Sequence, residues 1–167
     1  IASSGKLLRT ALGPMVFRAK DSKLTSRLVK VMGQIKNLDS VSARGERNVA
    51  TGLSDASAKL LLKGFDFNAR ATLGSVLNTS YSVDTGTGEV TLSSFNPMEQ
   101  LRAAEGATHF SLQVGYLNLN FETGESDLTL SPESVFPLVQ GVISPVLTPS
   151  GVPAGSGVGM HVLLIEF

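Results

Sequence analysis

Apolar residues recur with a helical period in the first third of the chain. Between residues 24 and 35 they fall at positions i, i+4, i+7, i+8 and i+11, which predicts an amphipathic helix. Asp21 or Ser22 can cap the start of this helix. The apolar stripe, which we expect to be buried, comprises Leu24, Leu28, Val31, Met32 and Ile35.

Two shorter helices are expected on either side of this one. The first follows a cap at Ser3 or Ser4 and stops at Gly13, which is followed by proline. The other begins after a cap at Ser54 and ends at Gly64, a residue type that commonly terminates helices.

From Phe65 onward the apolar period changes to two, which is typical of β-strands. The alternation changes phase near Gly115, and this predicts a β-bulge there. Turn-forming residues at 84–88 and 123–125 predict antiparallel hairpins. The expected strands cover residues 81–83, 90–92, 110–116, 117–121, 128–130 and 161–167.

Residues 132–159 are apolar but contain five prolines. Proline lacks the amide hydrogen that a central strand needs, so this segment should run extended along a sheet edge. That edge can belong to its own domain or to a neighbouring copy, and we favour the neighbour.

The elements together predict a mainly β chain of the α+β type, with a basic helical segment over residues 1–63. A jelly-roll-like antiparallel β-sandwich is expected over residues 64–167.

The net charge of zero hides a polarised chain. Residues 1–48 carry a net charge of +7, whereas residues 76–167 carry −8. Opposite charges on the two halves favour head-to-tail contact between copies. The assembly interface that we expect comprises Lys23, Arg27, Lys30, Glu122, Glu125, Asp127, Val135, Phe136, Leu138, Val142, Ile143 and Leu147.

The sequence offers little chemistry. It has no cysteine, which excludes disulfides, thiol catalysis and cysteine-ligated zinc. The two histidines, His109 and His161, lack the spacing of metal ligands, and the glycines at 155–159 lack the pattern of a phosphate-binding loop. We therefore expect no enzyme, no catalytic residue, no metal, no cofactor and no small-molecule substrate. The longest apolar run is the four residues 162–165, so no membrane-spanning segment is expected.

These observations favour a structural, self-assembling subunit of a filament, tube or surface layer. The alternative is a β-sandwich module that binds carbohydrate or protein, although a chain with no Trp and two Tyr offers few aromatic platforms for sugars. A third possibility is a nucleic-acid-associated protein, which we disfavour because no aromatic residue lies between Arg18 and Arg47 to stack on a base. The compartment stays open between the cell exterior or surface, which we favour, and the cytoplasm.

Four short motifs occur in a fixed order: GKLLR at 5–9, DSKLTSRL at 21–28, RGER at 44–47 and LKGFDFN at 62–68. This succession resembles a family of small bacterial proteins of uncharacterised function. The resemblance is strongest over residues 4–68 and looser over the β part. It implies a non-enzymatic protein with further residues on both sides of this chain, and it supplies no catalytic residue.

Overall fold

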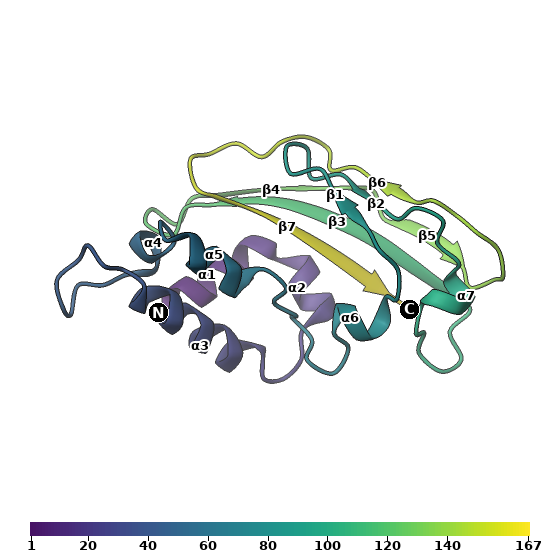
Figure 1. The fold of residues 1–167 in the computed structure, drawn as a ribbon, viewed down its shortest axis with the longest axis horizontal. Helices are drawn as coiled ribbons and strands as arrows, with labels where there is room; N and C mark the ends of the chain where they lie inside the picture. The colour runs from purple at the N-terminus through teal and green to yellow at the C-terminus, as the bar shows by residue number, and fades with distance from the viewer.

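The chain folds into three layers, which are a layer of helices, a larger antiparallel sheet and a small sheet (Figure 1). The computed structural model describes all 167 residues. The helices are α1 (Ala2–Leu12), α2 (Pro14–Ala19), α3 (Leu24–Asn37), α4 (Val49–Gly52), α5 (Ala56–Leu62), α6 (Leu73–Val76) and α7 (Pro97–Gln100). The strands are β1 (Ser82–Val83), β2 (Val90–Thr91), β3 (His109–Leu119), β4 (Ser126–Leu130), β5 (Ser134–Pro137), β6 (Val146–Leu147) and β7 (Val158–Glu166).

Helices occupy 30% of the residues and strands 23%, so the expectation of a mainly β chain is not confirmed. The antiparallel sheets and the helical N-terminal part are confirmed. The two predicted hairpins are present, because β1 pairs with β2 and β3 pairs with β4, each across the expected turn. The alternating residues 65–68 form no strand and lie in the connection between α5 and α6.

The helix predicted from the apolar stripe at residues 24–35 is α3. This stripe is buried as predicted, except for Val31, which is half-buried. Asp21 accepts the amide of Lys23 just before α3 begins, at 2.8 Å. The last expected helix is α5, but its cap is Asp55 rather than Ser54. The short helices α2, α4 and α6 were not predicted, because four to six residues carry too little periodicity to be recognised.

Strand β3 is the centre of the larger sheet. One of its edges pairs with β7 in a continuous register from Ser111 opposite Glu166 to Leu119 opposite Val158. Its other edge pairs first with β5 and then with β4. Because the ladder with β7 is unbroken at Gly115, the bulge predicted on β3 at this residue is wrong.

The extra residue lies instead on the facing chain, between β4 and β5. Leu130 is opposite Gly115 and Ser134 is opposite Leu112, so the three residues 131–133 face only two residues of β3. Pro132 at this bulge has no amide hydrogen to contribute to the ladder. The hydroxyl of Ser131 accepts the amide of Val114 at 3.0 Å, which satisfies a group that the bulge would otherwise leave unpaired.

The change of phase along β3 arises because the strand passes between two cores. Successive side chains of a strand point to opposite faces of the sheet. Phe110, Leu112 and Val114 belong to a core cluster on the side of the small sheet, whereas Leu117 and Leu119 belong to a cluster on the side of the helices. Each face of the sheet is therefore covered along a different part of the same strand.

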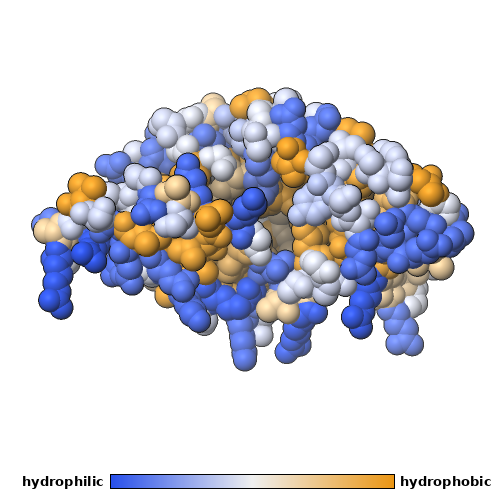
Figure 2. All heavy atoms as spheres, viewed as in Figure 1, coloured by the Kyte–Doolittle hydropathy of each residue, from blue (hydrophilic) through white to orange (hydrophobic).

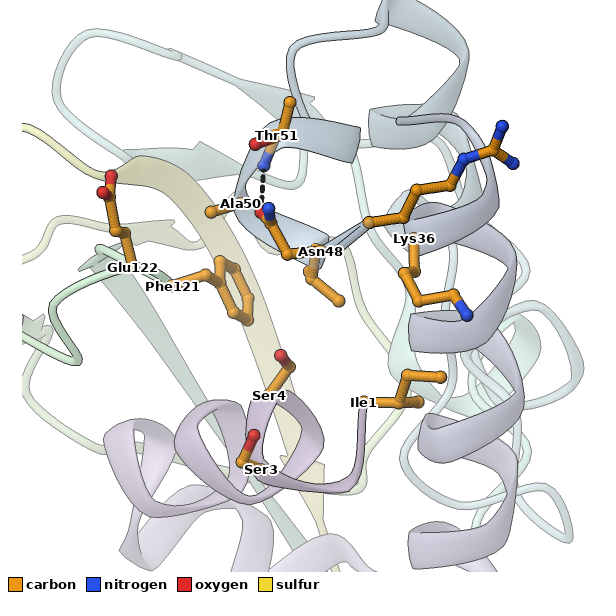
Figure 3. A pocket seen from close by; sticks show the side chains of 11 residues that line it. Ile1, Ser3, Ser4, Lys36, Asn48, Ala50, Thr51, Phe121 and Glu122 are labelled. Carbon is orange, nitrogen blue, oxygen red and sulfur yellow. Dashed lines mark hydrogen bonds between the residues drawn. The ribbon is translucent and has the colours of Figure 1, made fainter. Parts of the chain in front are cut away.

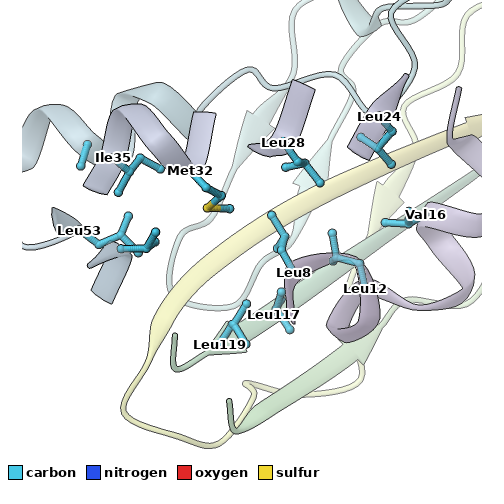
Figure 4. Close-up of a cluster of buried hydrophobic side chains, with 12 residues drawn as sticks. Leu8, Leu12, Val16, Leu24, Leu28, Met32, Ile35, Leu53, Leu117 and Leu119 are labelled. Atoms are coloured by element: carbon cyan, nitrogen blue, oxygen red, sulfur yellow. The ribbon is translucent and has the colours of Figure 1, made fainter. Parts of the chain in front are cut away.

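The helix-side core joins the helical layer to the larger sheet (Figure 4). Leu28, Met32 and Ile35 are fully buried and belong to the same cluster as Leu117 and Leu119 of β3. Helix α4 packs directly on the end of α3, because a Cβ at Gly52 would lie 2.2 Å from the carbonyl oxygen of Ile35. The expected boundary between residues 63 and 64 thus crosses a shared core.

The second core lies between the larger sheet and the small sheet, whose strand order is β1-β2-β6. Phe95 and Phe110 meet edge to face with ring centroids 6.0 Å apart, and Phe136 stacks on Phe110 at 5.4 Å. Phe136 comes from β5 and Leu147 of the same cluster comes from β6, so the proline-rich segment supplies part of this core.

The proline-rich segment follows the edges of its own sheets. Strand β5 pairs with β3, and β6 pairs with β2 at the edge of the small sheet. Residues 148–157 then cross the end of the larger sheet, where Thr129 donates to the carbonyl of Gly151 at 2.7 Å and the amide of Gly157 donates to Asn118 at 2.9 Å. The segment runs along sheet edges as expected, but β5 and β6 pair with strands of their own chain and not with the neighbouring copy that was favoured.

Candidate assembly surfaces

The charge polarity along the sequence becomes a polarity across the molecule. Residues 1–75 hold the helical layer and carry a net charge of +8, whereas residues 76–167 hold both sheets and carry −8. Among the basic side chains only Arg18 and Arg27 form ion pairs. Long hydrophilic side chains project along the rim of the molecule on the side of the helices (Figure 2). Most of the charge is therefore free to interact with another molecule.

The three basic residues expected at the interface have different environments. Lys23 and Lys30 are exposed at the start and on the outer face of α3. Arg27 turns inward and donates to the carbonyl of Asp66 at 2.6 Å and to the carboxylate of Asp21 at 2.7 Å. The guanidinium of Arg27 is therefore engaged within the chain, unlike the ammonium groups of Lys23 and Lys30.

Two of the sequence motifs lie far apart in the sequence, but the contacts of Arg27 bring them together in the fold. Arg27 and Asp21 come from DSKLTSRL, and Asp66 comes from LKGFDFN. The amide of Ala69 donates to Asp21 at 2.8 Å and, with the amide of Lys23 and with Arg27, lowers the pKa of this carboxyl. These motif residues tie α3 to the segment that follows α5, which is a structural role.

The acidic residues expected at the interface lie at the β3–β4 turn. Glu122 and Glu125 are exposed, and Asp127 accepts the amide of Ala154 at 2.7 Å. The turn is fixed because Asn120 accepts the amides of Glu122 and Thr123. Glu122 and Glu125 are therefore presented on a rigid turn, while Asp127 is engaged within the chain.

A hollow of about 360 Å³ lies beside this turn, between α1, α3 and α4 (Figure 3). Lys36 and Arg47 of the basic half and Glu122 of the acidic half line it together. The hydroxyl of Ser4, a residue that is 9% exposed, points into it without a hydrogen-bond partner (Figure 3). Opposite charges of the two halves thus also approach each other within one chain.

The apolar residues expected at the interface divide into two groups. Val135 and Val142 are 62% and 65% exposed. Phe136, Leu138 and Ile143 are partly buried and pack against the second core. Leu147 is 2% exposed and belongs to that core, so its side chain is buried within the chain and does not lie on the surface expected for it.

The loop between α3 and α4, which contains the RGER motif, is fixed by a buried carboxylate. Asp39 is 1% exposed and accepts the amides of Val41, Ser42 and Asn48 at 2.9–3.1 Å. Burial raises the pKa of Asp39, but these hydrogen bonds outweigh it and lower the pKa to about 2. The loop therefore presents its exposed arginines, Arg44 among them, on a fixed backbone.

The two histidines lie in different environments. His109 is exposed, whereas His161 is half-buried with its ring centroid 4.3 Å from that of Tyr116. The Nδ1 atom of His161 is buried without a hydrogen-bond partner, and burial lowers the pKa of this imidazole.

No three His, Cys, Asp or Glu side chains come together as metal ligands. None of the helices has the length and hydrophobicity that crossing a bilayer requires.

The outer edge of β7 is an open sheet edge that the sequence analysis missed. The backbone N–H and C=O of Val114 form hydrogen bonds with Ser131, so they point toward β4 and β5. Successive residues of a strand direct their backbone groups to opposite sides, so those of Gly115 point toward β7. Gly115 is opposite Val162, so the backbone groups of Val162 point inward. Those of Gly159, His161, Leu163 and Ile165 therefore point outward, and none has a partner within the chain.

This edge carries none of the usual protection against pairing with another strand. Native edge strands often carry lysine, proline or a bulge, and β7 has none of these. Its single charged residue is Glu166, which accepts from Nε of Arg18 at 3.0 Å. This hydrogen bond lowers the pKa of Glu166 and keeps the carboxylate on the face of the helices.

Comparisons of the chain with protein-family models, with curated proteins and with solved structures find no match.

Proposed function

We propose that this chain is a structural subunit that assembles head to tail with copies of itself. The observation that carries the proposal is the separation of charge between the basic helical layer and the acidic sheet layer. Lys23 and Lys30 on one side, and Glu122 and Glu125 on the other, are exposed and make no ion pair within the chain. They are the groups that we assign to the contact.

A contact between two different patches of the same chain is heterologous. Such a contact leaves one patch of each kind free at the ends, so it propagates into a ring or a filament. Exposed charge pairs are screened beyond about 10 Å at 0.1 M salt, and each contributes only about 1 kcal/mol or less. Charge therefore sets the direction and the rate of assembly. The exposed Val135 and Val142 of the acidic half supply apolar area.

A charge-swap experiment tests this contact. One variant carries Lys23→Glu and Lys30→Glu, and the second carries Glu122→Lys and Glu125→Lys. Each variant alone should assemble less than the unmodified chain in light scattering at low salt. An equimolar mixture should recover assembly, because the acidic α3 of one variant can meet the basic turn of the other.

Recovery in the mixture excludes misfolding as the cause of the single-variant defects. If each variant assembles as the unmodified chain does, the charged patches have no role in assembly. If the mixture stays as small as the separate variants, the two patches do not contact each other.

The second candidate is a β-sandwich module that binds another protein. The two stacked sheets suit this class, and Val135, Val142 and Val146 are each more than half exposed. A carbohydrate ligand is less favoured, because none of the exposed aromatic residues Phe17, Tyr81 and Phe167 forms a shared platform with a second ring. A chain that stays monomeric at all concentrations would favour this candidate over self-assembly.

A further inference from the structure

We infer that β7 pairs antiparallel with β7 of a second copy, across a two-fold axis at Val162, so that two larger sheets join into one. The inference rests on the proposed function, because it takes the partner to be a second copy of this chain. It concerns a different surface from the charged patches, because β7 lies at the open edge of the larger sheet (Figure 1).

The backbone of β7 is complementary to itself in this register. Full overlap of Val158–Glu166 with its copy places Val162 opposite Val162. The outward-pointing residues then face one another, with Gly159 opposite Ile165 and His161 opposite Leu163. Each such pair exchanges two N–H···O hydrogen bonds, so every outward backbone group of the four residues finds a partner.

The side chains are also compatible in this register. On the face of the helices, Val162 meets Val162 and Met160 meets Leu164, and apolar cross-strand pairs of this kind stabilise sheets. The only charged residue, Glu166, lies opposite Val158 and is held by Arg18. No like charges face each other, so the electrostatic barrier that keeps many sheet edges apart is missing.

The other long edge of the sheet does not offer the same opportunity. Along β4 the outward carbonyl of Leu130 accepts the amide of Ser150, and the side chain of Thr129 donates to Gly151, so the chain itself occupies part of that edge. The outward backbone groups of β7 make no such hydrogen bond within the chain.

Single cysteines test the register directly, because the chain has none of its own. Opposed residues of a non-hydrogen-bonded pair have Cα atoms about 4.5 Å apart, which a disulfide can span. Val162→Cys should therefore give a disulfide-linked dimer under mild oxidation. Met160→Cys is the matched control, since it lies on the same face but about 13 Å from its own copy in this register. A mixture of Met160→Cys with Leu164→Cys should cross-link, because these two positions are opposed.

A second pair of variants tests the backbone hydrogen bonds. His161→Pro removes an outward amide without removing one from the ladder with β3, whereas His161→Ala removes the imidazole and keeps the amide. The proline variant should raise the dissociation constant of the dimer roughly tenfold or more relative to the alanine variant, because each dimer loses two hydrogen bonds. Sedimentation of the full chain measures this difference.

The outcomes separate this inference from the proposed function. If the chain assembles but Val162→Cys cross-links no better than Met160→Cys, the pairing of β7 is wrong while self-assembly stands. If Val162→Cys cross-links but the charge swap has no effect, the edge pairing stands and the charged contact falls. A chain that is monomeric at every concentration contradicts both.

Discussion

Replacing Leu28 by alanine tests whether the helical layer and the larger sheet form one cooperative unit. Leu28 is 0% exposed and belongs to the core cluster that also contains Leu117 and Leu119 of β3. Truncation of a fully buried leucine to alanine costs about 2–5 kcal/mol, because apolar burial is lost and a cavity remains. For a chain of this size, the melting temperature should fall by roughly 4–20 °C.

The matched control is Leu60→Ala on α5, where the side chain is 65% exposed. An exposed substitution of this kind should change stability by about 0.5 kcal/mol or less. Unfolding is followed by far-ultraviolet circular dichroism, which reports the helices, and by tyrosine fluorescence, to which Tyr116 on the opposite face of β3 contributes. Both signals should shift together in Leu28→Ala. An unchanged midpoint, or a shift of the helical signal alone, would refute a shared core.

Three further predictions follow from burial and from the shifted pKa values. Leu147→Ala should lower the free energy of unfolding by about 2–5 kcal/mol in chemical denaturation, whereas Val142→Ala, at a position that is 65% exposed, should change it little; equal effects would contradict the placement of the proline-rich segment. The lowered pKa of His161 means that its contribution to stability is present above pH 6.5 and is lost as the pH falls through 6.5 toward the folded-state pKa. His161→Phe should therefore show a smaller drop in melting temperature between pH 7 and pH 5, and an equal drop would assign the effect to other groups. Asp39 has its pKa lowered from 3.8 to about 2, so Asp39→Asn should be less stable than the unmodified chain at pH 7, with the difference shrinking as the pH falls from 4 to 2; a difference independent of pH would remove the carboxylate from the explanation.

The elements that the sequence predicted best are those whose pattern is set by residues close to one another in the sequence. The stripe of α3 and the two hairpins follow from spacing and turn residues within about fifteen positions of one another. The phase change near Gly115 could not be interpreted in the same way. It fits a bulge or a strand that passes between two cores equally well, and only the packing of distant helices and of the small sheet decides between them.

The candidate interface was predictable only in part, for the same reason. Exposure of Lys23 and Lys30 follows from the helical period, but the engagement of Arg27 depends on carbonyls that lie about forty residues away. Burial of Leu147 depends on the pairing of β6 with β2. The open edge of β7 could not be predicted from its own residues, because strand order in a sheet is set by long-range pairing.

The measurement that tests self-assembly most directly is the molar mass of the full chain as a function of concentration and salt. One chain has a mass of 17.5 kDa. At low salt the mass should exceed twice this value and rise with concentration, because the charged contact propagates. At about 1 M salt it should fall toward that of a dimer, since screening weakens the charged contact but leaves the pairing of β7. A mass of 17.5 kDa at every concentration and salt would contradict the account.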